Sequence, residues 1–101
     1  MAAILTNSEV ERFVILAEEA GEVVQICMKI LRHGPYSYHP EDSEKTPNKE
    51  LLRKELADLI SIAQEMAWYG DIQYPSKEQI DYAKVKRQNY TYYQIDSKLK
   101  Q

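Results

Sequence analysis

Two short stretches decide the fold of this chain: Leu16-Ala-Glu-Glu-Ala-Gly-Glu-Val-Val-Gln25 and Leu52-Arg-Lys-Glu-Leu-Ala-Asp-Leu-Ile60. Each places acidic residues one helical turn apart inside a largely apolar, strongly helical stretch. A helix that buries one face normally keeps its acids on the opposite face. Carboxylates inside an apolar stretch need a compensating charge, and a divalent cation is the simplest one.

The second stretch belongs to a helix expected over residues 48–69, which Gly70 ends. On a wheel of about 100° per residue, Glu55 falls in the middle of the apolar arc and Asp58 lies at its edge. The apolar arc consists of Leu51, Leu52, Leu56, Leu59, Ile62, Ala63 and Met66. A solvated acid would lie opposite this arc, so we expect Glu55 to face the protein interior.

The first stretch belongs to a helix expected over residues 7–33, which ends before Gly34-Pro35. Glu18, Glu19 and Glu22 share one arc of about 100° on this helix. Apolar residues enter that arc and cover most of the remaining surface. A helix that is apolar nearly all round suits the middle of a bundle.

Packing these two helices together brings the acids into repulsion. Two carboxylates about 5 Å apart repel by roughly 3 kcal/mol at an effective dielectric near 20. A hard cation relieves this repulsion at neutral pH, and oxygen-only ligand sets suit Mg²⁺ and Mn²⁺. No His or Cys shares these arcs, which disfavours zinc.

Each cluster taken alone also has a simpler interpretation. Glu18, Glu19 and Glu22 could form an acidic stripe on a helix surface. Glu55 could be a buried acid that pairs with a basic side chain, and the candidates for that pairing are Lys29, Arg32 and Lys84. The occurrence of both clusters on successive helices favours the cation site.

The two motifs, with Lys29-Ile-Leu-Arg-His-Gly-Pro35 between them, resemble the MazG-type, all-alpha nucleoside triphosphate pyrophosphohydrolases. The signature of that family is EExxE on one helix followed by ExxD on the neighbouring helix, and both halves are intact in this chain. The resemblance covers about residues 10–90.

The resemblance implies a role for each acid. Glu19, Glu22, Glu55 and Asp58 would be the Mg²⁺ ligands, and Glu18 would help to hold or activate a water molecule. The family converts a nucleoside triphosphate, often a deoxynucleotide, to the monophosphate and pyrophosphate. The residue types fit this reaction, because metal ions neutralise phosphate charge and lower the pKa of a bound water, whose proton a carboxylate can accept.

A third helix is expected over residues 76–94, starting at the capping-box spacing of Ser76 and Gln79. By the resemblance, a late helix carries a basic residue and an Asn that contact the nucleotide. Lys84 and Asn89 match these positions best, with Arg87 beside them. A basic helix end that the helix dipole favours is the alternative explanation.

Length and composition limit the remaining classes of function. The 101 residues form a single domain, residues 1–101, and the net charge of −3 argues against a nucleic-acid polymer as partner. The single cysteine, Cys27, excludes an internal disulfide. Residues 1–6 lack the pattern of a signal peptide, and no apolar run has membrane length. We therefore expect a cytoplasmic protein without a membrane partner.

The assembly state follows from the helix count. Three helices with apolar surface on several sides do not close a core, and the family usually has an additional helix before the EExxE helix. We therefore expect an all-α, three-helix chain whose MazG-like bundle is completed in a homodimer or homotetramer. The alternative is a non-catalytic helical oligomerisation or interaction module with a structural carboxylate-cation site.

Overall fold

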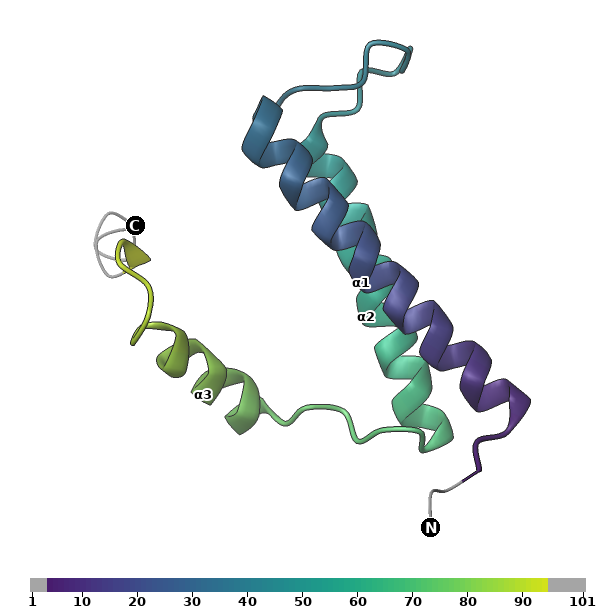
Figure 1. The fold of residues 1–101 in the computed structure, drawn as a ribbon. Coiled ribbons are helices and arrows are strands. Elements are labelled where there is room, and N and C mark those ends of the chain that lie inside the picture. Colours follow the sequence, from purple (N-terminus) through teal and green to yellow (C-terminus); the bar gives the residue numbers. More distant parts are fainter. Residues whose placement is uncertain (1–3, 95–101) are drawn as a thin grey trace.

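The structure is a computed structural model that describes residues 4–94, and within them the backbone forms three α-helices and no strand (Figure 1). The helices are α1 (Asn7–His33), α2 (Asn48–Tyr69) and α3 (Lys77–Arg87). The all-helical class is therefore confirmed. α1 and α2 run antiparallel, side by side, and we call this pair the hairpin; α3 lies apart from it. None of these three helices carries an apolar stretch that could cross a bilayer.

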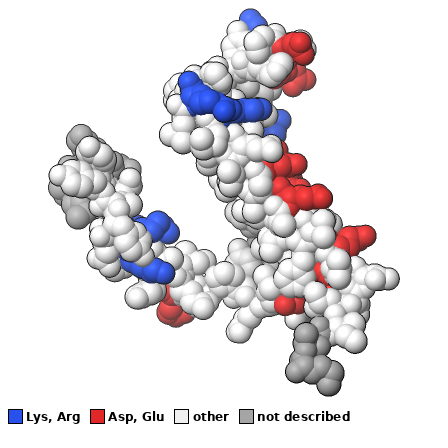
Figure 2. Space-filling view, viewed as in Figure 1, with Lys and Arg blue, Asp and Glu red and all other residues white. Residues whose placement is uncertain are grey.

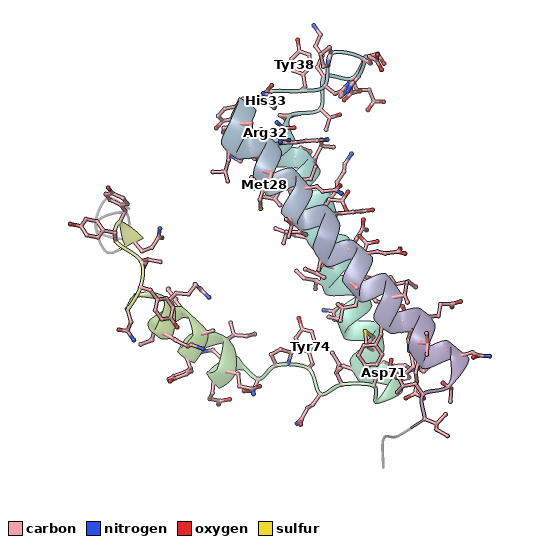
Figure 3. All side chains as sticks on the ribbon, viewed as in Figure 1. Met28, Arg32, His33, Tyr38, Asp71 and Tyr74 are labelled. Atoms are coloured by element: carbon pink, nitrogen blue, oxygen red, sulfur yellow. The ribbon has the colours of Figure 1, made fainter. Side chains whose placement is uncertain are left out.

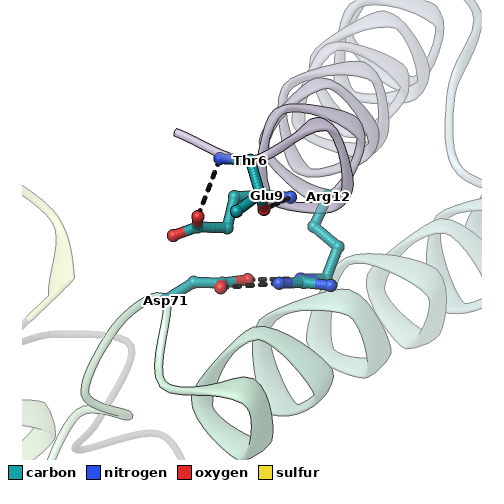
Figure 4. Close-up of polar contacts among 4 residues, drawn as sticks. All are labelled: Thr6, Glu9, Arg12 and Asp71. Carbon is teal, nitrogen blue, oxygen red and sulfur yellow. Dashed lines mark hydrogen bonds and ion pairs between the residues drawn. The ribbon is translucent and has the colours of Figure 1, made fainter. Parts of the chain in front are cut away.

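α1 begins with a capping box. The Glu9 amide donates to Thr6 Oγ1 at 3.1 Å, and the Thr6 amide donates to Glu9 Oε1 at 2.9 Å (Figure 4). These bonds satisfy two amides that the start of a helix would leave without a partner. Gly34 follows the last turn with a φ of 93°, a conformation that residues with a Cβ rarely adopt. The predicted range of α1 is confirmed.

The loop of residues 34–47 is fixed to the start of α2 through Asn48. The Asn48 amide donates to the Ser37 carbonyl at 2.8 Å, and Asn48 Nδ2 donates to the Gly34 carbonyl at 3.2 Å. The Asn48 residue is only 5% exposed, and a buried amide side chain is stable only when it is hydrogen-bonded. The first residues of the loop are therefore held against the start of α2, and the rest of the loop projects beyond the helix ends (Figure 1).

The packed seam between α1 and α2 is narrow. Within residues 4–94 its buried apolar residues are Ile26, Ile62 and Met66, and of these only Met66 is fully buried. Many large apolar side chains remain exposed on the hairpin: Val10, Phe13, Val14, Val24, Met28, Leu31, Leu56, Ile60 and Trp68. One copy of the chain therefore leaves much of its apolar surface uncovered, which is typical of an interaction surface.

α3 is shorter than the sequence predicts. Its capping box is present, because Ser76 and Gln79 bond each other's amides at 2.8 and 3.1 Å. The helix ends at Arg87, however, and not near residue 94. The following residues, Asn89-Tyr-Thr-Tyr-Tyr93, have low helix propensity. The predicted extent was wrong because it continued the helix through them.

A bidentate ion pair closes the end of the hairpin opposite the loop (Figure 4). Arg12 Nε and Nη2 donate to the two carboxylate oxygens of Asp71 at 2.5 and 2.8 Å. The two side chains are 15% and 2% exposed, and Arg12 Cζ lies 4.3 Å from the centroid of the Tyr69 ring. The Arg12 guanidinium holds the pKa of Asp71 below its ordinary value. The pair is therefore ionised at neutral pH and ties the start of α1 to the end of α2.

Replacing Asp71 by Asn should lower the melting temperature more than Asp81→Asn does. Asp71→Asn leaves the Arg12 charge without its carboxylate in a nearly buried contact. The Lys77–Asp81 pair on α3 is 88% and 61% exposed, and exposed pairs contribute little. Thermal unfolding followed by circular dichroism measures both variants. Equal shifts would contradict the structural role of the Arg12–Asp71 pair.

Candidate metal centre

The antiparallel packing of α1 and α2 brings acids from both helices to one place near the middle of the seam. Glu19 of α1 and Glu55 and Asp58 of α2 each offer a carboxylate oxygen, and these three oxygens all lie within 4.8 Å of one another. We call these three residues the carboxylate cluster. Figure 2 shows acidic side chains gathered along one side of the hairpin, with basic side chains nearer its loop end.

Two oxygen atoms of the cluster are buried without a hydrogen-bond partner. They are Glu19 Oε2 and Glu55 Oε2, and both residues are half-buried. A buried polar atom that lacks a partner costs the full desolvation penalty of its group. Asp58 is exposed, so the cluster has one open side. A group that approaches from that side can reach the inner oxygens.

Two carboxyls of the cluster, those of Glu19 and Glu55, have raised pKa values. The pKa of Glu55 rises to about 7 because Glu22 is near enough to share its proton, because burial disfavours the charged form, and because the neighbouring carboxylates repel that charge. Burial, followed by repulsion from Glu22, also raises the pKa of Glu19. Both carboxyls therefore resist ionisation unless a positive charge joins them.

The structure places the five predicted acids in different surroundings. Glu55 is half-buried, as its position in the apolar arc predicts. Glu22 is exposed, yet its carboxylate acts on both Glu19 and Glu55. Glu18 is exposed and contributes a smaller repulsion to Glu19.

The alternative in which Glu55 pairs with a basic side chain finds no support within the described residues. The ion pairs in residues 4–94 are Arg12–Asp71, Glu50–Arg53 and Lys77–Asp81. None of them includes Glu55. The positive charge that the cluster lacks is thus not supplied by this part of the chain.

The predicted nucleotide-binding residues lie elsewhere. Lys84 and Arg87 are on α3, and Asn89 follows it. Among the described residues, α3 contacts neither α1 nor α2. Within one copy of the chain, these side chains are therefore not brought to the carboxylate cluster.

The structure also forms a pocket that sequence reasoning missed. It has a volume of about 290 Å³ and lies where the end of α1, the loop and the start of α2 meet. We call it the loop-end pocket. Lys29, Arg32, His33, Tyr38, His39 and Asn48 are among the residues that line it. The signal in the sequence that could have indicated this pocket is the group of basic residues Lys29, Arg32 and His33, which directly precedes a loop that contains Tyr and His.

Comparisons of this chain with protein-family profiles, with curated proteins and with solved structures found no match. The resemblance to the MazG type therefore rests on the EExxE and ExxD motifs and stays a prediction.

In protein free of divalent cations, thermal stability should fall as pH rises from about 4.5 to about 7. Over this window folded Glu55 keeps a proton that the unfolded chain, with its ordinary pKa of 4.5, releases. The folded state therefore binds more protons, and stability decreases with pH. Melting temperatures measured in a chelator across the window should show this slope.

Glu55→Gln should remove most of that slope, because an amide does not titrate. The Arg12–Asp71 pair does not interfere, since the ordinary pKa of Asp71 is 3.8 and its pKa in the folded state is lower still. If the dependence of melting temperature on pH persists unchanged in Glu55→Gln, another titrating group causes it.

Proposed function

We propose that this chain is a divalent-cation-dependent nucleoside triphosphate pyrophosphohydrolase of the MazG type. The observation that carries the proposal is the meeting of Glu19, Glu55 and Asp58 within 4.8 Å, with two of their oxygens buried and unpartnered. Acids that repel one another in an apolar seam are relieved either by protonation or by a positive charge, and a cation lets them stay ionised at neutral pH. The EExxE and ExxD motifs of the MazG type account for the presence of acids at these positions.

The donor set fits Mg²⁺ or Mn²⁺. All three groups of the cluster are carboxylates, and hard divalent cations prefer oxygen ligands. Glu22 is the fourth ligand that the motif supplies, and its effect on Glu19 and Glu55 supports a place beside them. The exposed side of Asp58 leaves room for water and phosphate oxygens, which Mg²⁺ usually retains among its ligands.

The reaction splits the bond between the α-phosphorus and the oxygen that bridges to the β-phosphorus. A bound Mg²⁺ or Mn²⁺ supplies charge neutralisation at the phosphates and lowers the pKa of water. The carboxylates of the chain accept the proton of the water whose oxygen attacks the α-phosphorus. Glu18, which is exposed beside Glu19, suits this role. The products are a nucleoside monophosphate and pyrophosphate.

The assembly that we propose is a homodimer or a homotetramer. Besides the exposed apolar residues of the hairpin, α3 carries Ile80, Tyr82 and Val85 with 54, 69 and 58% of their surface exposed. A helix of only 11 residues without packing partners is marginal in water. Contact with a second copy would cover α3 and could carry Lys84, Arg87 and Asn89 to a nucleotide bound by that copy.

The second candidate function is a non-catalytic helical interaction module with a structural cation. The uncovered apolar surface of the hairpin favours it, because such surface alone requires no chemistry. The two functions differ in turnover, since only the enzyme releases pyrophosphate. A panel of ribo- and deoxynucleoside triphosphates separates them.

Adding Mg²⁺ or Mn²⁺ should raise the melting temperature, because a ligand bound only by the folded state stabilises that state. Glu55→Gln should remove most of the gain. Glu65→Gln is the matched control, since Glu65 is an exposed acid of the same helix outside the carboxylate cluster. A metal response that survives in Glu55→Gln would place the cation elsewhere.

Glu22→Ala and Asp58→Ala should each lower kcat by orders of magnitude, because each removes a ligand of the ion that activates water and neutralises charge. Lys84→Ala should mainly raise KM, provided that its contact is equally strong in the ground and transition states. Product analysis completes the test. Release of orthophosphate and a nucleoside diphosphate would contradict the proposed bond cleavage.

Light scattering or analytical ultracentrifugation should find at least a dimer. Interfaces built from this much apolar surface are usually large, so the mass should change little on dilution. A folded, stable monomer would refute the proposed assembly.

A further inference from the structure

The loop-end pocket is formed by three segments that fix one another. Arg32 and His33 come from the last turn of α1 and Tyr38 comes from the loop, and all three lie at the loop end of the hairpin (Figure 3). The wall at the start of α2 is Asn48, whose bonds to the Ser37 and Gly34 carbonyls hold the loop in place. The pocket is thus part of the folded hairpin and needs no rearrangement to exist.

Its lining is cationic and carries no acid. Lys29 and Arg32 line the pocket together with His33 and His39. Among the described residues, neither Lys29 nor Arg32 has a carboxylate within ion-pair distance. His39 Nδ1 accepts the Glu41 amide at 3.1 Å, so neutral His39 carries its proton on Nε2 as a donor. These donors suit an anion with several oxygen atoms.

The helix dipoles do not decide the charge of the pocket. The negative end of α1 and the positive end of α2 meet at the same place, so their contributions largely offset each other. The first two amides of α2, at Asn48 and Lys49, are already bonded to the Ser37 and Pro35 carbonyls. The side chains of Lys29 and Arg32 therefore give the loop-end pocket its preference for an anion.

The pocket lies along the same seam as the carboxylate cluster. Lys29 follows Glu19 of the cluster by ten residues on α1, about 15 Å of helix axis, and follows Glu22, which acts on the cluster, by seven residues, about 10 Å. Leu51, another lining residue, precedes Glu55 by four residues on α2, or about 6 Å. One extended polyphosphate can therefore contact the cluster with one end and the pocket with the other.

We propose that the loop-end pocket binds the phosphates of the nucleotide that leave as pyrophosphate. This inference rests on the proposed function for the identity of the ligand. The α-phosphate lies at the carboxylate cluster, and the more highly charged β- and γ-phosphates extend toward Lys29 and Arg32. Arginine binds phosphate oxygens in pairs, so Arg32 is the main anchor.

Titration of inorganic pyrophosphate into protein held in a chelator tests the pocket without the metal. Calorimetry should detect binding, and the ring signals of His33 and His39 should shift in nuclear magnetic resonance spectra. Arg32→Gln should weaken the affinity by at least about tenfold, as expected for loss of hydrogen bonds to a charged group. Arg32 is exposed, so the variant should fold, and an unchanged melting temperature checks this.

Lys86→Gln is the matched control, because it removes one positive charge from α3, which does not contact the hairpin. It should leave pyrophosphate affinity unchanged. Equal losses of pyrophosphate affinity in Arg32→Gln and Lys86→Gln would show that only the net charge of the protein matters, and would overturn the proposal. Shifts of the His33 and Tyr38 signals by a free nucleoside, with none by pyrophosphate, would also overturn it and assign the pocket to the base.

The outcomes separate this inference from the proposed function. Pyrophosphate binding that depends on Arg32 supports the pocket even if no nucleoside triphosphate is hydrolysed, a result that would refute only the enzyme. Hydrolysis that proceeds with the same KM in Arg32→Gln, with unchanged inhibition by pyrophosphate, would refute only the pocket.

Discussion

Mutual repulsion of carboxylates in the α1–α2 seam is the constraint on which the rest of this structure depends. Glu19 and Glu55 lie in a seam that leaves one oxygen of each buried and unpartnered. The hydrogen bond with Glu22, burial and repulsion from the neighbouring carboxylates together raise the pKa of Glu55 to about 7. An apolar pair of the same shape would pack with less cost. A cation bound at the proposed site would offset this cost.

Local signals account for the part of the fold that the sequence predicted. The capping boxes at Thr6 and Ser76 mark the starts of α1 and α3, and the glycines at 34 and 70 mark the ends of α1 and α2. These signals act within a few residues, so these helix ends could be read directly from the sequence. The inward position of Glu55 followed from helical periodicity. The convergence of acids from two helices followed from the resemblance, because the family signature places EExxE and ExxD on neighbouring helices.

The features that were missed depend on longer-range interactions. The end of α3 is set by a balance between weak helix propensity and missing packing partners, and no motif marks that balance. The loop-end pocket depends on how Asn48 fixes the loop, and a sequence pattern does not reveal where a loop folds back. Arg12 and Asp71 are 59 residues apart, and nothing in either segment identifies its partner.

The local connectivity of the hairpin has a kinetic consequence. α1 and α2 follow each other in the chain and pack through one loop of residues 34–47, so their docking has low contact order, and topologies of this kind fold fast. In the proposed assembly, the meeting of two copies would be a concentration-dependent step on a slower scale. The acids are therefore brought together while the chain is still single, and the electrostatic barrier belongs to the first folding step. Protons or divalent cations in the surrounding solution would then set how quickly the hairpin of each newly made chain forms.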